Sequence, residues 1–138
     1  ELAQALSLDD EALETPAARV EADYASLEAA TAQGLVASAI AAGWGGAGAA
    51  LARSSLAGGL GVHVETGWTR AQWFTESAGG MMVSTAAEDA AAFARLVPQA
   101  RPIGLVSAGD SLEIDGEVAS KEALLDAYRR HESGKISQ

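Results

Sequence analysis

Two short glycine-rich segments contain the residues best suited to holding a phosphate group. In the first, Gly45 and Gly46 follow an apolar run and come just before a stretch of small, helix-forming residues. A glycine turn that opens a helix directs several backbone N–H groups to one point, where the helix dipole also favours an anion. The turn lacks the lysine and the Ser/Thr of a Walker A loop. It is therefore either a simple phosphate cradle or a place where a helix packs closely against a sheet.

The second segment contains Ser77, Gly79 and Gly80 and leads into a run of strand-forming residues. Successive backbone N–H groups in such a turn can form a concave anion site. The alternative is a tight entry into the strand. Taking the two segments together, we predict binding of a substrate phosphate or a nucleotide at Gly45, Gly46, Ser77, Gly79 and Gly80.

Other catalytic chemistry is poorly represented in the chain. It contains no cysteine, which excludes disulfides, thiol nucleophiles and cysteine zinc sites. His63 alternates with two valines, so we expect it on the solvent side of a strand, and His131 lies close to the C-terminal end. Neither has a second histidine or a carboxylate at a metal-ligand spacing such as i, i+4. We therefore predict no catalytic residue and no metal site.

The charge balance excludes two classes of partner. The formal net charge is -10, from 9 Lys and Arg against 19 Asp and Glu. Nucleic acid and anionic membrane surfaces both require clustered cations. No apolar run approaches the roughly 18 residues that cross a bilayer, and the absence of cysteine fits a cytoplasmic protein. We expect a cytoplasmic domain with no nucleic-acid and no membrane partner.

The elements that must position the glycines alternate between helix and strand. The Thr15-Pro16 pair is a helix start, and Gly34 suits a left-handed C-terminal cap. The Asp115-Gly116 pair is a tight-turn signal. We expect helices at 16–33, 48–56, 87–96 and 120–131, strands at 35–40, 61–65, 81–85, 103–107 and 111–114, and a loop or edge at 66–73. This order predicts an α/β (α+β) fold in which helices pack on a mixed β-sheet.

The first glycine run also resembles a motif in the C-terminal domain of the synthetases related to aminoimidazole ribonucleotide synthetase. In that family a strand leads into His-Asp-x-Ser-Asp-Gly-Gly and then into a helix. Aligning the two family glycines with Gly45 and Gly46 places the histidine at Ile40, the first aspartate at Ala41 and the second at Trp44. The family pattern continues through the next helix to the sequence LAGGLG.

Further stretches agree with the same family in order and spacing. The sequence ESAGGMMV at 76–83 resembles the family's Glu-Ser-x-x-Arg entry to a strand, with Gly80 where arginine is common. The sequence PIGLV at 102–106, followed by LEI at 112–114, resembles its next strand pair. Glu1-Leu2-Ala3 resembles the segment just past the N-terminal half-domain of the family. The resemblance runs over residues 1–131. Within the family, the chain most resembles the phosphoribosylformylglycinamidine synthases, also called formylglycinamide ribonucleotide amidotransferases.

The resemblance implies a chemistry for the intact relatives. There, ATP activates an amide oxygen as a phosphate ester, and ammonia from glutamine displaces it, in purine biosynthesis. ATP and Mg²⁺ are then cofactors of the parent ligase, and the isolated domain, with no cofactor of its own, is expected to support the substrate site without catalysing the reaction.

The same resemblance implies partners and a division of the chain. The partners are an N-terminal ATP-binding half-domain of the same chain and, as further candidates, a glutaminase domain or subunit and a second copy in a homodimer. Residues 1–15 are expected to lead in from that missing half-domain, 16–131 to form a single C-terminal synthetase-like domain, and 132–138 to form a tail.

A second interpretation stays open because three polar positions of the family motif are apolar here. The second aspartate faces the metal in the family picture, whereas Trp44 offers an indole without an oxygen ligand. The alternatives are a degenerate, non-catalytic structural or interaction domain of the same superfamily, or a relative acting on another substrate. The role of Trp68 and Trp73 also has two interpretations. The two side chains form a contact patch for a missing domain, or they fill the core.

Overall fold

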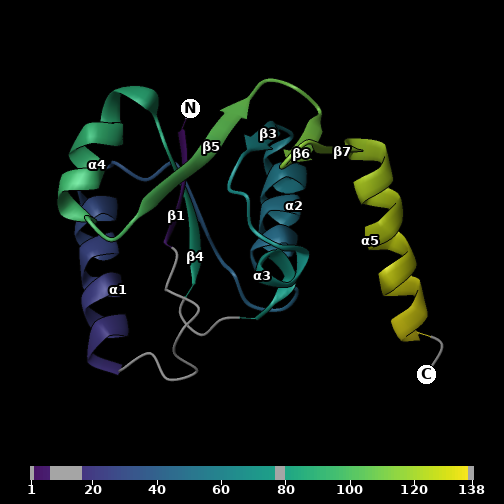
Figure 1. Cartoon of the computed structure of the whole chain (residues 1–138), viewed down its shortest axis with the longest axis horizontal. Helices are drawn as coiled ribbons and strands as arrows, with labels where there is room; N and C mark the ends of the chain where they lie inside the picture. The colour runs from purple at the N-terminus through teal and green to yellow at the C-terminus, as the bar shows by residue number, and fades with distance from the viewer. Residues whose placement is uncertain (1, 7–16, 77–79, 137–138) are drawn as a thin grey trace.

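The computed structural model describes residues 2–6, 17–76 and 80–136, whose arrangement is shown in Figure 1. Seven strands within these residues form one sheet in the order β2-β4-β1-β5-β3-β6-β7. Neighbouring strands pair antiparallel, except that β3 and β6 are parallel, so the sheet is mixed. In chain order the strands are β1 (Leu2–Leu6), β2 (Ser38–Ala41), β3 (Gly61–Val64), β4 (Met81–Thr85), β5 (Arg101–Ser107), β6 (Ser111–Ile114) and β7 (Glu117–Ser120).

Helices cover both faces of this sheet. In Figure 1, α1 and α4 lie together on one side of β1 and β4, and α2 and α3 lie together on the other side of the molecule's centre, with α5 beyond them. The helices are α1 (Ala17–Ala32), α2 (Gly46–Gly58), α3 (Arg70–Phe74), α4 (Ala90–Leu96), which follows the 3-10 turn η1 (Ala87–Asp89), and α5 (Lys121–Ile136). The predicted class, helices packed on a mixed sheet, is confirmed.

Each helix layer buries its own apolar cluster. The layer of α1 and α4 surrounds Phe93 and Val97, both fully buried, together with Val83 from the sheet. The layer of α2 and α3 contains Ala50 and Trp73 against the sheet. Because alanine buries little apolar area, the few large side chains supply much of each cluster. In the cluster under α2 and α3, the sheet contributes Val62, Val64, Met82, Ile103 and Leu112.

Residues 2–6 form β1 near the middle of the sheet, where β1 pairs with both β4 and β5. The boundary that we predicted at residue 15 therefore does not coincide with the edge of the sheet. At the other end, α5 continues to Ile136, five residues beyond the helix end predicted at 131. The division of the chain into a lead-in, a domain and a tail stays a prediction.

The loop expected at 66–73 is wrong in part, because residues 70–74 form α3. The side-chain oxygen of Thr69 accepts a hydrogen bond from the Gln72 N–H, and the Gln72 side chain accepts one from the Thr69 N–H. This reciprocal capping satisfies two N–H groups that a short helix otherwise leaves exposed. No helix among the described residues is both long and apolar enough to cross a membrane.

Candidate functional site

The glycine turn lies at the end of β2 and forms the start of α2. Gly45 (φ 80°) and Gly46 (φ 66°) both adopt left-handed backbone conformations that other residues rarely take. The N–H of Ala42 donates to the carbonyl of Gly80 over 2.8 Å, which brings the entry to β4 beside this turn. Gly45, Gly46 and Gly80 therefore lie at one end of the sheet, whereas Ser77 and Gly79 lie outside the described residues.

Close packing between α2 and α3 explains part of this glycine content. A Cβ atom on Gly46 would lie 2.7 Å from the Trp73 carbonyl oxygen and 2.8 Å from that of Thr75. A Cβ on Gly48 would lie 2.8 Å from the Phe74 ring. The Gly46 N–H donates to the Gly43 carbonyl, so Ala47 and Gly48 supply the remaining first-turn N–H groups without an acceptor inside the helix. Phosphate binding at Gly45 and Gly46 stays a prediction alongside this packing role.

The three apolar replacements in the family motif border the same turn. Ile40 and Ala41 are the last residues of β2, and Ile40 packs against the cluster under α2. Trp44 projects from the turn with 74% of its surface exposed. Mg²⁺ requires oxygen ligands, which none of these side chains supplies. Among the described residues, no group of three His, Cys, Asp or Glu side chains is placed to hold a metal, so these residues do not fit the family's magnesium.

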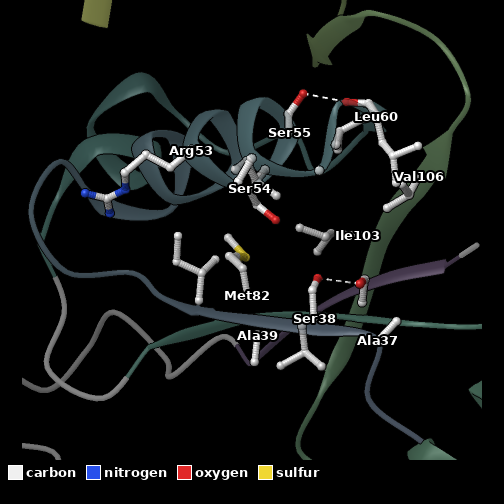
Figure 2. Close-up of a pocket in the computed structure, with 17 residues that line it drawn as sticks. Ala37, Ser38, Ala39, Arg53, Ser54, Ser55, Leu60, Met82, Ile103 and Val106 are labelled. Atoms are coloured by element: carbon white, nitrogen blue, oxygen red, sulfur yellow. Dashed lines mark hydrogen bonds between the residues drawn. The ribbon is translucent and has the colours of Figure 1, made fainter.

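A groove of about 640 Å³ lies between α2 and strands β2, β4 and β5 (Figure 2). The sequence did not predict this groove. Met82 and Ile103 form its floor, and the hydroxyls of Ser38 and Ser84 lie 2.6 Å apart on the strands beside them. Ser54 lies within the helix that the sequence predicts at 48–56. Its spacing of three residues from Leu51, which is buried, is the signal that its hydroxyl faces the sheet.

The most heavily hydrogen-bonded carboxylate of the described residues joins the α3 segment to the β6–β7 turn. One Asp115 oxygen accepts from the N–H groups of Thr66 (2.6 Å) and Gly67 (3.0 Å). The other accepts from the Thr66 hydroxyl (3.2 Å) and from Nε1–H of Trp73 (2.9 Å). Hydrogen bonds to the charged form, led by that of the Thr66 N–H, lower the pKa of Asp115 to about 2. We interpret this as a structural lock, because donors of Thr66, Gly67 and Trp73 occupy both carboxylate oxygens.

Trp68 and Trp73 meet beside this lock, with ring centroids 4.7 Å apart and planes inclined by 51°. Trp73 is only 3% exposed and belongs to the apolar cluster under α2, and Trp68 packs against that cluster. Of the two interpretations left open by the sequence, the structure supports the core role. Trp44, in contrast, is exposed in the glycine turn itself.

His63 lies on the face of β3 opposite the cluster under α2, and its ring is between two carboxylates. Its Nδ1 is 2.9 Å from Glu113, and its Nε2 is 3.4 Å from Glu65. The hydrogen bond with Glu113 raises the pKa of His63, and the negative charge of Glu113 is the next largest cause. Both ring nitrogens of His63 therefore face a carboxylate, and no three such side chains in the described part of the chain are placed to hold a metal.

The carboxylate of Glu113 should therefore control the titration of His63. We expect Glu113→Gln to lower the pKa of His63, followed by NMR of its ring protons, while Glu65→Gln lowers it less. Because the folded pKa is raised, the interaction stabilises the fold at pH values below about 6.5. Its contribution is lost as the pH rises through the folded pKa. Equal shifts in the two variants would contradict the assignment of Glu113 as the main partner.

The fold and its glycine turn define the class: an α/β domain with a mixed seven-stranded sheet and a helix that opens at paired glycines. Residues 3–117 match the family described as AIR synthase related protein, C-terminal domain. The match covers most of the chain, and the chain belongs to this family.

Solved structures of Thermotoga maritima PurL have the same fold. The PurL complex with ADP is 17% identical with a TM-score of 0.73, and the match covers 89% of this chain and 24% of that chain. Phosphoribosylformylglycinamidine synthase II from the same organism is 16% identical with a TM-score of 0.74, covering 89% and 25%. The PurL complex with FGAR is 14% identical with a TM-score of 0.72, covering 89% and 27%. The chain thus spans about a quarter of the length of these proteins. No curated protein matches it.

Proposed function

We propose that this chain is the C-terminal domain of a phosphoribosylformylglycinamidine synthase-like ligase, an ATP-dependent enzyme of purine biosynthesis in the cytoplasm. The observation that carries the proposal is the family match over residues 3–117 in a chain that folds like the corresponding quarter of PurL. The domain supports the substrate site, and catalysis requires the N-terminal ATP-binding half-domain of the same chain. A glutaminase that supplies ammonia and a second copy of the chain are further partners under this proposal.

The domain's own share of the substrate site is the end of the sheet where Gly45, Gly46 and Gly80 meet. The first-turn N–H groups of Ala47 and Gly48 are the donors that this end can offer to a phosphate. The nearby carbonyls of Trp73 and Thr75 carry negative partial charge, so an anion binds to these N–H groups rather than directly at Gly46. ATP and Mg²⁺ belong to the parent enzyme; PurL structures with ADP, ATP and AMPPCP support the nucleotide.

Titration with formylglycinamide ribonucleotide and, separately, Mg²⁺-ADP tests this assignment. We expect the ribonucleotide to bind, to change Trp44 fluorescence and to be displaced by inorganic phosphate. Trp44→Phe is the matched control: calorimetry should still detect binding while most of the fluorescence change is lost. Trp68 and Trp73 remain in that variant and report an intact core.

A degenerate interaction domain is the second candidate function, and the apolar residues Ile40, Ala41 and Trp44 at the polar motif positions favour it. It predicts that neither ligand binds to the chain, even when the fold is intact. That result would remove the phosphate site and leave the domain as a packing partner. Binding of a ribonucleotide of different structure, without formylglycinamide ribonucleotide, would instead indicate a relative with another substrate.

A further inference from the structure

We propose that the groove beneath α2 binds a small amphipathic carboxylate, with the apolar part of the ligand on the sheet and its carboxylate at Arg53. The groove is separate from the glycine turn: its helix wall comes from the second half of α2, and none of Gly45, Gly46 or Gly80 lines it. The inference therefore does not depend on the proposed ligase function.

The volume and composition of the groove are those of a small-molecule site. Ligand pockets in proteins commonly enclose roughly 300–1,000 Å³, are mainly apolar and contain a few polar groups that set orientation. This groove measures about 640 Å³. Its floor on the sheet combines Met82 and Ile103, each 6% exposed, with Val106, and Leu51 adds an apolar side chain from α2. An apolar ligand body would cover this floor and displace water from it.

An irregularity in the sheet widens the apolar floor. The pairing of β1 with β5 shifts register between Ala3 and Gln4, which leaves Ile103 opposite no residue of β1. In a regular strand, Ile103 and Val106 would point to opposite faces, because side chains alternate. The bulge allows both to line the groove.

The polar groups of the groove select an anion. Nineteen Asp and Glu residues occur in the chain. Among the residues that the structure describes, none of these acids lines the groove, and Arg53 is the charged residue of the lining. Figure 2 shows Arg53 reaching past one end of the groove and the Ser54 hydroxyl pointing from α2 toward the sheet. Neither side chain forms a hydrogen bond or ion pair within the part of the chain that the structure describes.

A single guanidinium matches a single negative charge. A carboxylate can accept two parallel hydrogen bonds from an arginine fork, so Arg53 alone can hold the head group at its end of the groove. A doubly charged phosphate would leave one charge without a cation in a protein of net charge -10. The remaining hydroxyls do not compete for the head group, because Ser38 and Ser84 bond each other and Ser55 donates to the Leu60 carbonyl.

The two methionines of the chain provide an internal readout. Met82 lines the groove, whereas its neighbour Met81 packs against the cluster under α1 and α4 on the opposite face. With ¹³C-methyl methionine, titration with decanoate below its micelle concentration should shift the Met82 signal and leave the Met81 signal in place. Decanol, decyltrimethylammonium and acetate separate the contributions of tail and charge: each should bind at least tenfold more weakly than decanoate.

Variants at the head-group end complete the test. We expect Arg53→Gln to weaken decanoate binding about tenfold or more, while Arg95→Gln, an exposed arginine on the far face, leaves it unchanged. Ser54→Phe, which fills the groove from the helix, should abolish the Met82 shift without lowering the melting temperature appreciably. Equal binding of decanol and decanoate, unchanged binding in Arg53→Gln, or equal shifts of both methionine signals would overturn the proposal.

Discussion

Replacing Gly46 by alanine should destabilise the domain by about 3 kcal/mol. A non-glycine residue in the left-handed region costs about 1 kcal/mol, and the structure places Gly46 at φ 66°. The new Cβ would also overlap the carbonyl oxygens of Trp73 and Thr75, at 2.7 and 2.8 Å. These are backbone atoms of α3 and of the C-cap residue that follows it, which must move together, so overpacking adds about 1–3 kcal/mol. Urea denaturation followed by far-UV circular dichroism measures the loss.

Gly43→Ala is the matched control in the same turn. A Cβ at Gly43 meets nothing within 4 Å, and its backbone is outside the left-handed region. Its effect should lie within about 1 kcal/mol and can be stabilising, because alanine restricts the unfolded chain more than glycine does. If Gly46→Ala were as stable as Gly43→Ala, close packing of α2 on α3 would not explain the glycine, and its phosphate role would be favoured.

Local patterns in the sequence predicted the elements that depend on local interactions. The strand expected at 81–85 is β4, and Gly34 ends the first helix with the predicted positive φ of 73°. The strand at 35–40 was placed too early: β2 begins at Ser38, while Leu35 and Val36 pack into the cluster of α1 and α4. A continuous apolar run has no alternation, so it does not indicate where pairing begins.

The strand β1, whose partners are distant in the sequence, was not predicted. β1 exists because it pairs with β4 and β5, about 80 and 100 residues further along the chain. No local signal encodes such a partner. By contrast, two missed elements had local signals: Thr69 and Gln72 have the spacing of a capping box, and Asp115-Gly116 predicts a second strand after its turn.

The sequence identified the glycines of the candidate site, and their role in binding a phosphate stays a prediction. Gly45, Gly46 and Gly80 were identified from the sequence, and the structure brings them to one end of the sheet. A glycine pair is required equally by a phosphate and by a close helix contact, and the helix in contact, α3, was itself missed. The groove depends on the β5 bulge at Ile103 and on the direction of the Ser54 hydroxyl, which only the packed structure reveals.

Asp115→Asn should lower the free energy of unfolding by about 2 kcal/mol at neutral pH, since hydrogen bonds to a charged acceptor contribute about 1.5–3 kcal/mol and partial exposure reduces this. Asparagine tolerates the positive φ of 50° at this position, so the turn itself is retained. Its amide has one acceptor oxygen, which cannot serve both the Thr66–Gly67 amides and the Trp73 Nε1–H. The buried indole then loses its acceptor.

The pH dependence separates this charged lock from an ordinary turn contact. Because the folded pKa of Asp115 is lowered to about 2 from 3.8, its stabilisation is complete above the unfolded pKa and is lost as the pH falls from about 4 toward 2. The stability difference between the native chain and Asp115→Asn should shrink over that window, in urea titrations at successive pH values. Asp110→Asn, which removes the same charge from a nearby exposed bend, should show neither the loss nor its pH dependence. A difference that stayed constant down to about pH 2 would mean that the carboxylate charge contributes nothing and that the turn is held by shape alone.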